Sequence, residues 1–375
     1  MNFENDMLYL SLCALKGIKP SLERVKNTDP KKLYKSCCAH NVTALVCYAL
    51  EEVVTPPELW LEAKGQAIRK NMLFDAELSK ITAYMDKCGI FYLPLKGILL
   101  KEYYPKAGMR QMSDNDIYYD STHREEIEEY MLSQSYECIA KTENHDVYKR
   151  PPVYNFEMHH LLFSKESSEV FYEYYSDINN RMISDGCNTQ GYHLSDEDFY
   201  IFIVAHEYKH FAGFGTGVRS LLDIIVILDK FGKTLDWDYI QAETEKLGIA
   251  DFEQSQRSLC RKLVTVSSEK ELTAEEEELL QYFLSEGVYG NYSTGIVNRL
   301  TGETGRKDRK VTFSMKVKYI FRRLFPPMEF YRLHYPFFYK YKILIPCCFF
   351  YRVYMALFRR SSFVETEIKA LKNKN

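Results

Sequence analysis

The chain has 375 residues, of which 46% are hydrophobic and 27% are charged. This composition excludes a disordered chain, a fibrous chain and a small disulfide-stapled scaffold, and the length predicts two domains or one elaborated domain. The formal net charge of −3 conceals an asymmetry, because residues 306–375 carry 17 Lys and Arg against 4 Asp and Glu, whereas residues 1–305 carry 32 against 48. The basic end is therefore a separate region.

Cysteine usage and hydropathy indicate the compartment. The ten cysteines form no Cys-x-x-Cys pair and the first residues do not form a secretory signal, so we expect reduced thiols in a cytoplasmic protein. The most apolar stretch, residues 335–358, is interrupted by charged residues and a proline, and a membrane-spanning helix is not expected.

The first region, residues 1–87, is expected to be helical. Short apolar clusters separated by polar turns predict small helices up to about residue 50. Apolar residues then recur at helical spacing from Glu58 to Lys87, and Gly89 is expected to end this long helix.

Residues 88–190 are expected to form an α+β core with a small mixed β-sheet. In chain order, the pattern predicts a strand over Ile90–Leu95, a helix over Ile98–Tyr104, a strand over Ser113–Tyr119, a surface helix over Ser121–Ser133, and strands over Asp146–Lys149 and Tyr154–Phe163. In the last strand, Asn155, Glu157 and His159 share the face opposite Phe156 and Met158.

From Leu194 the pattern is helical, in a domain over residues 191–305 and a basic, aromatic-rich helical tail over residues 306–375. Ser195 is expected to cap a helix over Phe199–His210. Further helices are predicted over Val218–Phe231 and Glu271–Glu286.

The most specific local pattern is Asp114-Asn115-Asp116. Carboxylates at positions i and i+2 of a strand lie on one face, about 7 Å apart at Cα, and can converge on one or two hard cations. Oxygen ligands favour Mg²⁺ or Mn²⁺, and proteins commonly bind Mg²⁺ together with substrate phosphates. An exposed turn supplies the same pattern by chance, so the surroundings decide its meaning.

The segment before this acid pair adds a phosphate-binding feature. Leu95-Lys96-Gly97 lies between a predicted strand and a predicted helix, where a glycine and backbone N–H groups can accommodate a phosphate. One of the two acids would then face the phosphate.

These residues resemble a known family. Gly89-Ile90, Leu95-Lys96-Gly97, Tyr104-Pro105, Arg110 and Ser113-Asp114-Asn115-Asp116-Ile117 are similar to the signature of the uncharacterised bacterial nucleotidyltransferases, a branch of the polymerase-β-like superfamily. The helical N-terminal region, the strand with Glu157-Met158-His159 and the later helices extend the resemblance to roughly residues 5–360.

The resemblance implies transfer of a nucleoside monophosphate from a nucleoside triphosphate to an acceptor hydroxyl or phosphate, with two Mg²⁺ (or Mn²⁺) ions and release of pyrophosphate. Carried over by position, Asp114 and Asp116 would bind both ions, and Glu157 would be the third carboxylate, which holds one ion and takes the proton of the acceptor. The residues implied to bind the nucleotide are Lys96, Gly97, Arg110 and Ser113. Candidates for contacts with the acceptor or with the catalytic residues are His159, His206, His210, Arg219 and Asp223.

Two features depart from the superfamily pattern. Lys96-Gly97-Ile98 stands where the superfamily has Gly-Gly or Gly-Ser, so a serine contact to the phosphates is missing and Lys96 is the expected substitute. Glu157 is assigned from strand phase alone, and Glu166 and Glu169 are weaker rivals because they lie beyond the apolar part of the strand.

His206-Glu207-Tyr208-Lys209-His210 offers a competing function, because it matches the His-Glu-x-x-His pattern of zinc peptidases. Against this, Lys209 puts a charge beside the histidines, and Thr216 stands where the longer form of the motif has a third histidine. The alternative interpretation is that the two histidines hydrogen-bond helices together or line the cleft.

Two further patterns have a structural interpretation. Arg219 and Asp223 are four residues apart on a predicted helix, which favours an ion pair within that helix. The basic tail is expected to pack on the acidic body, and contact with nucleic acid or an anionic membrane surface is the alternative.

The sequence thus predicts a cytoplasmic, Mg²⁺-dependent nucleotidyltransferase that uses a nucleoside triphosphate. No motif specifies the acceptor, which can be a small molecule, a peptide, a protein side chain or an RNA end. The alternatives are a catalytically inactive binding or scaffold protein of the same fold and a zinc metallopeptidase that uses His206, Glu207 and His210.

Overall fold

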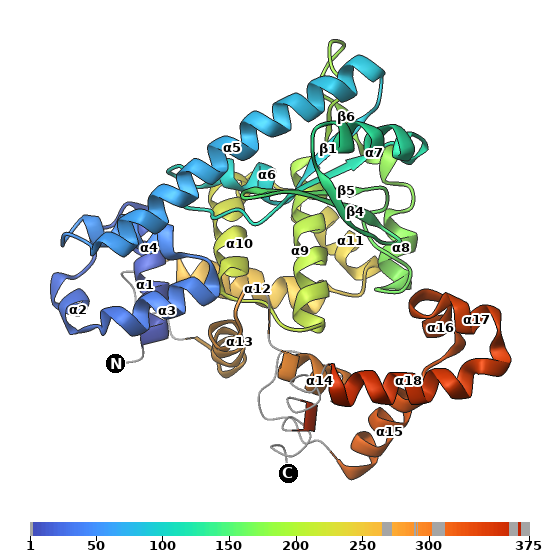
Figure 1. Ribbon diagram of the computed structural model, residues 1–375. Coiled ribbons are helices and arrows are strands. Elements are labelled where there is room, and N and C mark those ends of the chain that lie inside the picture. Colours follow the sequence, from blue (N-terminus) through green and yellow to red (C-terminus); the bar gives the residue numbers. More distant parts are fainter. Residues whose placement is uncertain are drawn as a thin grey trace. The chain divides into compact units, whose positions relative to one another are not determined.

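A computed structural model describes residues 3–264, 272–288, 290, 292–301, 312–359 and 367–368 (Figure 1). The chain divides into two compact units, residues 1–209 with 218–277 and residues 210–217 with 278–375. The first unit contains the β-sheet and all of the candidate site residues except His210. Among the described residues, no helix combines the length and the apolar character needed to cross a membrane.

The first unit begins with short helices followed by one long helix. The short helices are α1 (Phe3–Lys16), α2 (Leu22–Asn27), α3 (Pro30–His40) and α4 (Thr43–Glu51). The long helix α5 (Glu58–Cys88) ends at Gly89, whose φ of +72° is the left-handed conformation in which glycine carries no steric penalty. The predicted small helices, the long helix and its C-terminal glycine are confirmed.

A five-stranded mixed sheet lies at the centre of this unit, with the strand order β1-β2-β5-β4-β3. The strands are β1 (Tyr92–Leu95), β2 (Asn115–Tyr119), β3 (Glu137–Lys141), β4 (His145–Arg150) and β5 (Tyr154–His159). β2 and β5 are parallel, and the other neighbouring pairs are antiparallel. The predicted α+β class with a small mixed sheet is therefore confirmed. The strand β3 was not predicted, and β5 ends four residues earlier than expected.

The connections between the strands include short helices. β1 leads into α6 (Gly97–Leu100) and a 3-10 turn, η1 (Lys101–Tyr103), where one continuous helix was expected. β2 is followed by η2 (Ser121–His123) and α7 (Arg124–Ser133), which together span the predicted surface helix. Asp120 caps η2 by accepting a hydrogen bond from the N–H of Thr122.

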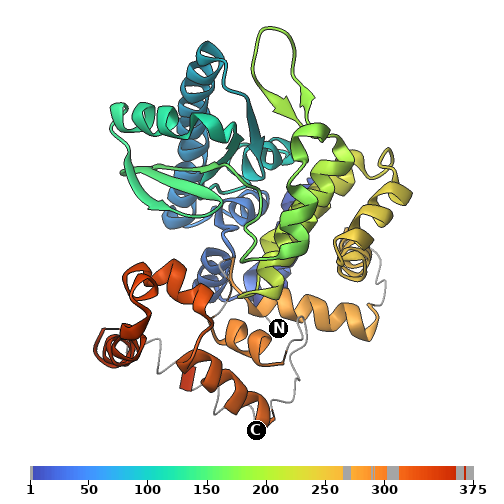
Figure 2. The same cartoon turned by 90° about the vertical axis from the view of Figure 1, so that its right-hand side faces the viewer.

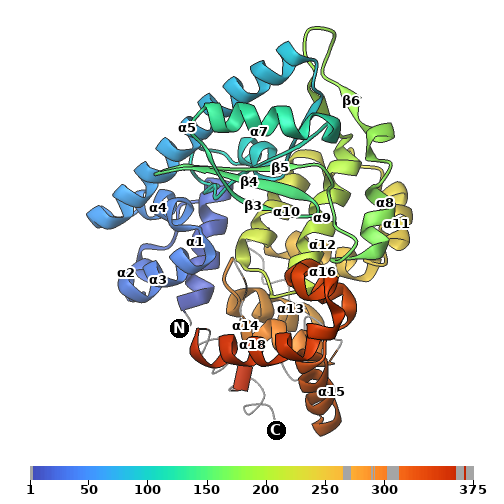
Figure 3. The ribbon, with the colours of Figure 1, turned by 45° about the vertical axis from the view of Figure 1, so that its right-hand side comes forward.

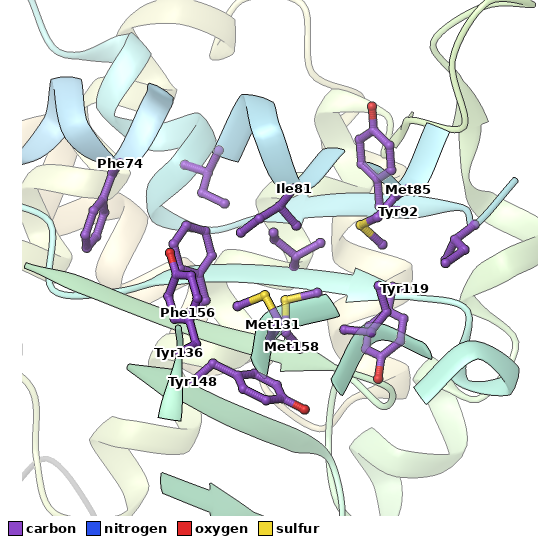
Figure 4. Packing of buried hydrophobic residues seen from close by; sticks show 14 of the residues in the cluster. Phe74, Ile81, Met85, Tyr92, Tyr119, Met131, Tyr136, Tyr148, Phe156 and Met158 are labelled. Atoms are coloured by element: carbon purple, nitrogen blue, oxygen red, sulfur yellow. The ribbon is translucent and has the colours of Figure 1, made fainter. Parts of the chain in front are cut away.

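One face of the sheet is covered by α5 and α7, which lie above it in Figure 3. Side chains from these helices and from alternate strand positions form one buried hydrophobic cluster, shown in Figure 4. Its members include Phe74, Ile81 and Met85 from α5, Met131 from α7, and Tyr92, Tyr119, Tyr148, Phe156 and Met158 from the strands. Burial of each such side chain contributes about 1.5–3 kcal/mol, so this cluster fixes which strand residues face inward. The remaining strand positions face the opposite side.

Helices α9 (Asp196–Ala212) and α10 (Val218–Phe231) lie on that opposite side (Figures 1 and 3). Ser195 caps α9 as predicted, because its hydroxyl accepts a hydrogen bond from the N–H of Asp198 at 3.1 Å. The ring of Tyr103 packs edge-on against Phe199 of α9 and against Phe231 of α10. The turn after β1 is thereby attached to both helices.

The other elements of the first unit surround this arrangement. They are α8 (Glu169–Tyr175), η3 (Ile178–Arg181), the two-stranded ribbon of β6 (Ile183–Ser184) and β7 (Tyr192–His193), α11 (Trp237–Lys246) and α12 (Ala250–Leu263). The ribbon extends upward in Figure 2 and connects to the sheet where Tyr92 N–H donates to the Gln190 carbonyl at 3.1 Å.

The second unit is helical over the part of it that is described. Its elements are most of α13 (Ala274–Ser285), α14 (Tyr292–Thr301), α15 (Phe313–Leu324), α16 (Met328–His334), α17 (Pro336–Lys340), η4 (Lys342–Leu344) and α18 (Ile345–Phe358). Tyr282 and Asn298 hydrogen-bond to the carbonyl of Phe211, which joins α13 and α14 to residues 210–217. Glu271, expected to begin α13, and parts of the predicted basic tail, residues 306–311, 360–366 and 369–375, lie outside the described residues.

Candidate functional site

The polar face of the sheet brings together acidic residues that are far apart in the sequence. In the parallel pair of β2 and β5, Asp116 lies directly opposite Glu157, and Tyr118 lies opposite His159. Because Phe156 and Met158 point into the hydrophobic cluster, Glu157 and His159 face the other side, where Asp116 also lies. The predicted strand phase of Glu157 therefore agrees with its position opposite Asp116.

Asp116 is the most strongly paired of these acids and is 4% exposed. Its Oδ1 accepts hydrogen bonds from Lys96 Nζ at 2.8 Å and from His159 Nε2 at 2.9 Å. Burial alone would raise the pKa of this carboxyl, but the Lys96 and His159 charges and hydrogen bonds hold it well below its usual range. Asp116 is therefore an ionised carboxylate in a buried position.

Asp114 directly precedes β2, and its pKa is shifted in the opposite direction to that of Asp116. Burial and the negative charges of Asp116 and Glu157 raise its pKa to about 6, although Lys96 and Arg219 act in the other direction. Three carboxylates thus lie close enough to repel one another. Strongly shifted carboxyl pKa values of this kind are concentrated at functional sites.

Lys96 and Gly97 connect β1 to the acids in a strained segment. Lys96 has a φ of +48°, an uncommon conformation for a residue with a side chain, and its ammonium is directed at Asp116. At Gly97 an added Cβ would lie 2.5 Å from Arg110 Nη1 and 2.8 Å from Met112 Cε. The structure therefore accounts for the glycine by close packing. The expected phosphate position at a helix N-terminus involves α6, a helix of four residues.

Arg110 is buried and forms an ion pair with Asp223 of α10. Its Nε and Nη2 donate to the two carboxylate oxygens of Asp223 at 2.8 and 3.0 Å, and Tyr104 OH donates to the same carboxylate at 2.7 Å. The expected ion pair between Arg219 and Asp223 within α10 is therefore wrong. Arg219 Nη1 instead donates to the Gln111 carbonyl at 3.5 Å. A buried, bidentate guanidinium is the stronger partner for a buried carboxylate.

Two lysines that were not predicted as site residues lie beside the acids. Lys70 of α5 donates to the Ser113 carbonyl at 3.2 Å, and its charge interacts with Asp114. Lys209 of α9 is largely buried, and burial together with the charge of Lys96 lowers its pKa to about 8, against the opposing effect of Asp116 and Glu157. No hydrogen bond or ion pair connects the Lys209 ammonium to another described residue. Both lysines add positive charge next to the acids.

The position of Lys209 bears on the zinc-peptidase alternative. Lys209 lies within the His206–His210 segment, and its charge interacts with Asp116 and Glu157 of the sheet. Glu207 is buried next to Asp223, and this raises its pKa to about 7. Among the described residues, one group of His, Cys, Asp and Glu side chains has ligand atoms close enough to share an ion. It consists of His145, Glu157 and His159 and includes neither His206 nor His210. Within the described part of the chain, the group that could share an ion therefore lies on the sheet.

His145 of β4 is the third member of that group, and it too was not predicted. β4 runs antiparallel to β5, with His145 opposite His159, and the two rings lie 4.8 Å apart between centroids. Burial and the neighbouring His159 lower the pKa of His145 to about 4, so its imidazole is neutral at pH 7.

The fold and this polar face define an α+β protein with an acidic, lysine-flanked site on a mixed sheet. The family model described as uncharacterised nucleotidyltransferase matches residues 26–265, and the chain therefore belongs to this family. The match covers α3 to α12 and part of α2, a shorter range than the resemblance expected from the sequence. No curated protein and no solved structure matches the chain.

Proposed function

We propose that the protein transfers a nucleoside monophosphate from a nucleoside triphosphate to an acceptor hydroxyl or phosphate and releases pyrophosphate. The observation that carries the proposal is the register of Asp116 opposite Glu157 on parallel neighbouring strands, with Asp114 close to both. Membership of a nucleotidyltransferase family supports nucleotidyl transfer in general. The three acids support the polar face of the sheet as the place where this chemistry would occur.

The donor set fits a divalent cation. Asp114, Asp116 and Glu157 are carboxylates, the ligands that Mg²⁺ and Mn²⁺ prefer. The raised pKa of Asp114 reflects its burial and then the repulsion by Asp116 and Glu157, and a shared cation would relieve that repulsion. These three residues would hold Mg²⁺ or Mn²⁺, which would neutralise charge on the phosphates and activate the acceptor oxygen.

The other residues of the face would serve the phosphates and the acceptor. Lys96 and Lys209 supply positive charge beside the acids, where the triphosphate would lie. Glu157 would accept the proton of the acceptor hydroxyl as its oxygen forms a bond to the α-phosphorus. The bond between the α-phosphorus and the bridging oxygen then breaks, and both of its electrons leave with pyrophosphate.

Arg110 would act by positioning. Arg110 is 8% exposed and both of its hydrogen bonds to Asp223 are buried, so direct contact with a triphosphate would require that ion pair to open. We propose that it holds the segment before β2 against α10 and so fixes Asp114.

The test is transfer of label from each α-labelled ribonucleoside triphosphate, with Mg²⁺ or Mn²⁺, together with pyrophosphate release. Asp116→Asn should reduce either signal at least 100-fold because it removes the charge that the ions require. The matched control is Asp120→Asn, four residues further along the same segment, where asparagine can replace aspartate as a cap of η2.

Equal activity of Asp116→Asn and the wild type would contradict the proposal. If the protein binds a nucleotide but releases pyrophosphate with none of the four ribonucleoside triphosphates, the result would support the alternative of an inactive binding protein. In either case, the unfolding temperature of each variant shows whether the fold is retained.

A further inference from the structure

A cluster of two imidazoles and one carboxylate lies at the edge of the acidic face. His145 and His159 face each other on the antiparallel strands β4 and β5, and Glu157 lies two residues before His159. Glu157 Oε2 is 3.6 Å from His159 Nε2 and 3.8 Å from His145 Nε2. One ligand atom from each of the three residues lies within 4.8 Å of the other two.

These distances are close to those around a bound ion. An ion about 2.1 Å from each ligand atom leaves neighbouring ligand atoms roughly 3.0–3.5 Å apart in octahedral or tetrahedral geometry. The two separations that include Glu157 exceed this range by a few tenths of an ångström. The two imidazole ligand atoms lie within 4.8 Å of each other, so rotation of the His145 and His159 rings would complete the coordination.

Hydrogen bonding fixes His145 in the orientation of a ligand. The hydroxyl proton of Thr142 Oγ1 is directed at the His145 carbonyl at 2.7 Å and Asn144 Oδ1 at 3.2 Å, and Oγ1 lies 3.4 Å from His145 Nδ1. Since that hydroxyl proton is committed, the hydroxyl can only accept from Nδ1–H. The Nε2 lone pair then points at Glu157, so that two acceptors face each other across 3.8 Å. A hydrogen bond at the other ring nitrogen is the usual support of a metal-bound histidine.

The buried ring of His159 has a second unexplained feature. Its Nδ1 has no hydrogen-bond partner among the described residues, and its Nε2 lies 2.9 Å from Asp116 Oδ1, where an ion bound at Nε2 would replace the proton between these two atoms. The hydrogen bond to Asp116 explains the position of His159. It does not explain why the His145 imidazole and the Glu157 carboxylate oxygen also lie near His159 Nε2. A shared cation accounts for all three.

We propose that His145, Glu157 and His159 bind one divalent transition-metal ion of the series from Mn²⁺ to Zn²⁺. Imidazole nitrogens favour these ions over Mg²⁺, which prefers an all-oxygen set and retains its water. The ion would lie on the Glu157 side of the acids, next to but separate from the position between Asp114 and Asp116. Binding of this ion does not depend on the proposed function. The role of a nitrogen-bound ion next to the acceptor during catalysis rests on the proposed function.

Ion binding tests the proposal without nucleotide. Full-length protein freed of metal with a chelator is titrated with Mn²⁺, Zn²⁺ and Mg²⁺ by calorimetry, and the Mn²⁺ complex is examined by pulsed electron paramagnetic resonance for coupling to imidazole nitrogen. We expect one nitrogen-coupled Mn²⁺ ion per chain in the wild type, Zn²⁺ binding at the same position, and at least tenfold weaker binding of this ion in His145→Ala. A tenfold excess of Mg²⁺ should not displace the ion.

His160→Ala is the matched control, because His160 neighbours the cluster in sequence but its ring contacts the Glu143 carbonyl at 2.7 Å. It should bind as the wild type does. His145→Gln retains a polar side chain and replaces His145→Ala if that variant does not fold. Wild-type-like binding by both His145 variants, or Mn²⁺ binding without nitrogen coupling, would overturn the proposal.

Failure of this proposal is distinguishable from failure of nucleotidyl transfer. Transfer with Mg²⁺ by a protein that binds no transition ion would overturn the metal site and leave the proposed function intact. His145-dependent Mn²⁺ binding by a protein that transfers no nucleotide would do the reverse.

Discussion

Arg110 and Asp223 form a buried ion pair in which one guanidinium donates to both oxygens of one carboxylate, at 2.8 and 3.0 Å. The two residues are 113 positions apart, and the pair joins the segment before β2 to α10. It therefore attaches the segment that leads into Asp114 and Asp116 to α10.

The first prediction concerns this pair. Asp223→Ala leaves a buried guanidinium without its partner and should lower the free energy of unfolding by about 3–5 kcal/mol. Arg110→Ala should cost a similar amount, and the double variant should cost less than the sum of the two. Urea unfolding of the three variants measures this. Arg219→Ala serves as the control and should cost under about 1 kcal/mol; a larger loss there, with additive losses for the pair, would contradict the assignment.

The second prediction concerns nucleotide binding. A triphosphate at about a hundred times its Kd adds roughly 2.7 kcal/mol to stability, which corresponds to a shift of several degrees in Tm. We expect such a shift in the wild type with one or more ribonucleoside triphosphates and Mg²⁺, and its loss in Asp116→Asn. Asp120→Asn should behave as the wild type. A shift of equal size in Asp116→Asn would show that the nucleotide binds elsewhere.

The third prediction concerns Lys209. Its ammonium is largely buried beside Asp116 and Glu157, and its charge is available to the triphosphate. Lys209→Gln should lower kcat/KM for the nucleotide by about 10- to 100-fold, equivalent to roughly 1.4–2.8 kcal/mol of transition-state stabilisation. The Tm should not fall, because the substitution removes a buried charge. Lys165→Gln, at an exposed lysine paired with Glu169, is the control. An unchanged kcat/KM would remove Lys209 from the proposed site.

The fourth prediction concerns acid stability and involves residues away from the acids. Glu276 accepts hydrogen bonds from Lys262, Ser258 and the N–H of Thr273, and these lower its pKa to about 2. Since the folded pKa is below the unfolded value of about 4.3, the stabilisation is complete above that value and is lost as the pH falls towards 2.

Glu276→Gln should therefore lower the free energy of unfolding at pH 7 by about 1–3 kcal/mol, because it removes charged hydrogen bonds. It should also flatten the pH dependence between about 4.3 and 2. Chemical unfolding across this range measures both effects. Glu275→Gln changes an exposed neighbour in the same turn and should leave the profile unchanged. Parallel profiles for the wild type and Glu276→Gln would contradict the prediction.

Local patterns were sufficient to predict much of the sheet face. Alternation around Phe156 and Met158 placed Glu157 on the polar side, because hydrophobic burial decides which face of a strand turns inward. The end of α5 was predicted because Gly89 adopts a backbone conformation that other residues avoid. In both cases the information lies within a few neighbouring residues.

The errors and omissions have a different origin. The strand β3 reads Glu-Cys-Ile-Ala-Lys and is mostly exposed at the edge of the sheet, so it carries no clear alternation. Asp223 prefers Arg110 to the helical neighbour Arg219 because a buried bidentate contact outweighs local spacing. Lys209 and His145 lie close to acids on other elements of the fold, and the spacing of residues along the chain does not predict this proximity.

The domain boundaries and the roles of the individual site residues stay predictions. The expected regions 1–87, 88–190, 191–305 and 306–375 follow composition, whereas the two compact units follow packing, and α9 passes from one unit into the other. Expression of residues 1–277 alone would test whether the first unit folds independently.

The strand order has a consequence for the assembly of the protein during synthesis. β5 is the last of the five strands of this sheet to leave the ribosome, yet it occupies the middle of the sheet between β2 and β4. The pairs β1–β2 and β3–β4 can form earlier as separate hairpin-like halves, each with an unpaired edge. Asp116 consequently acquires Glu157 and His159 as neighbours in the same event that joins the two halves. The acidic face and the continuous sheet are completed together.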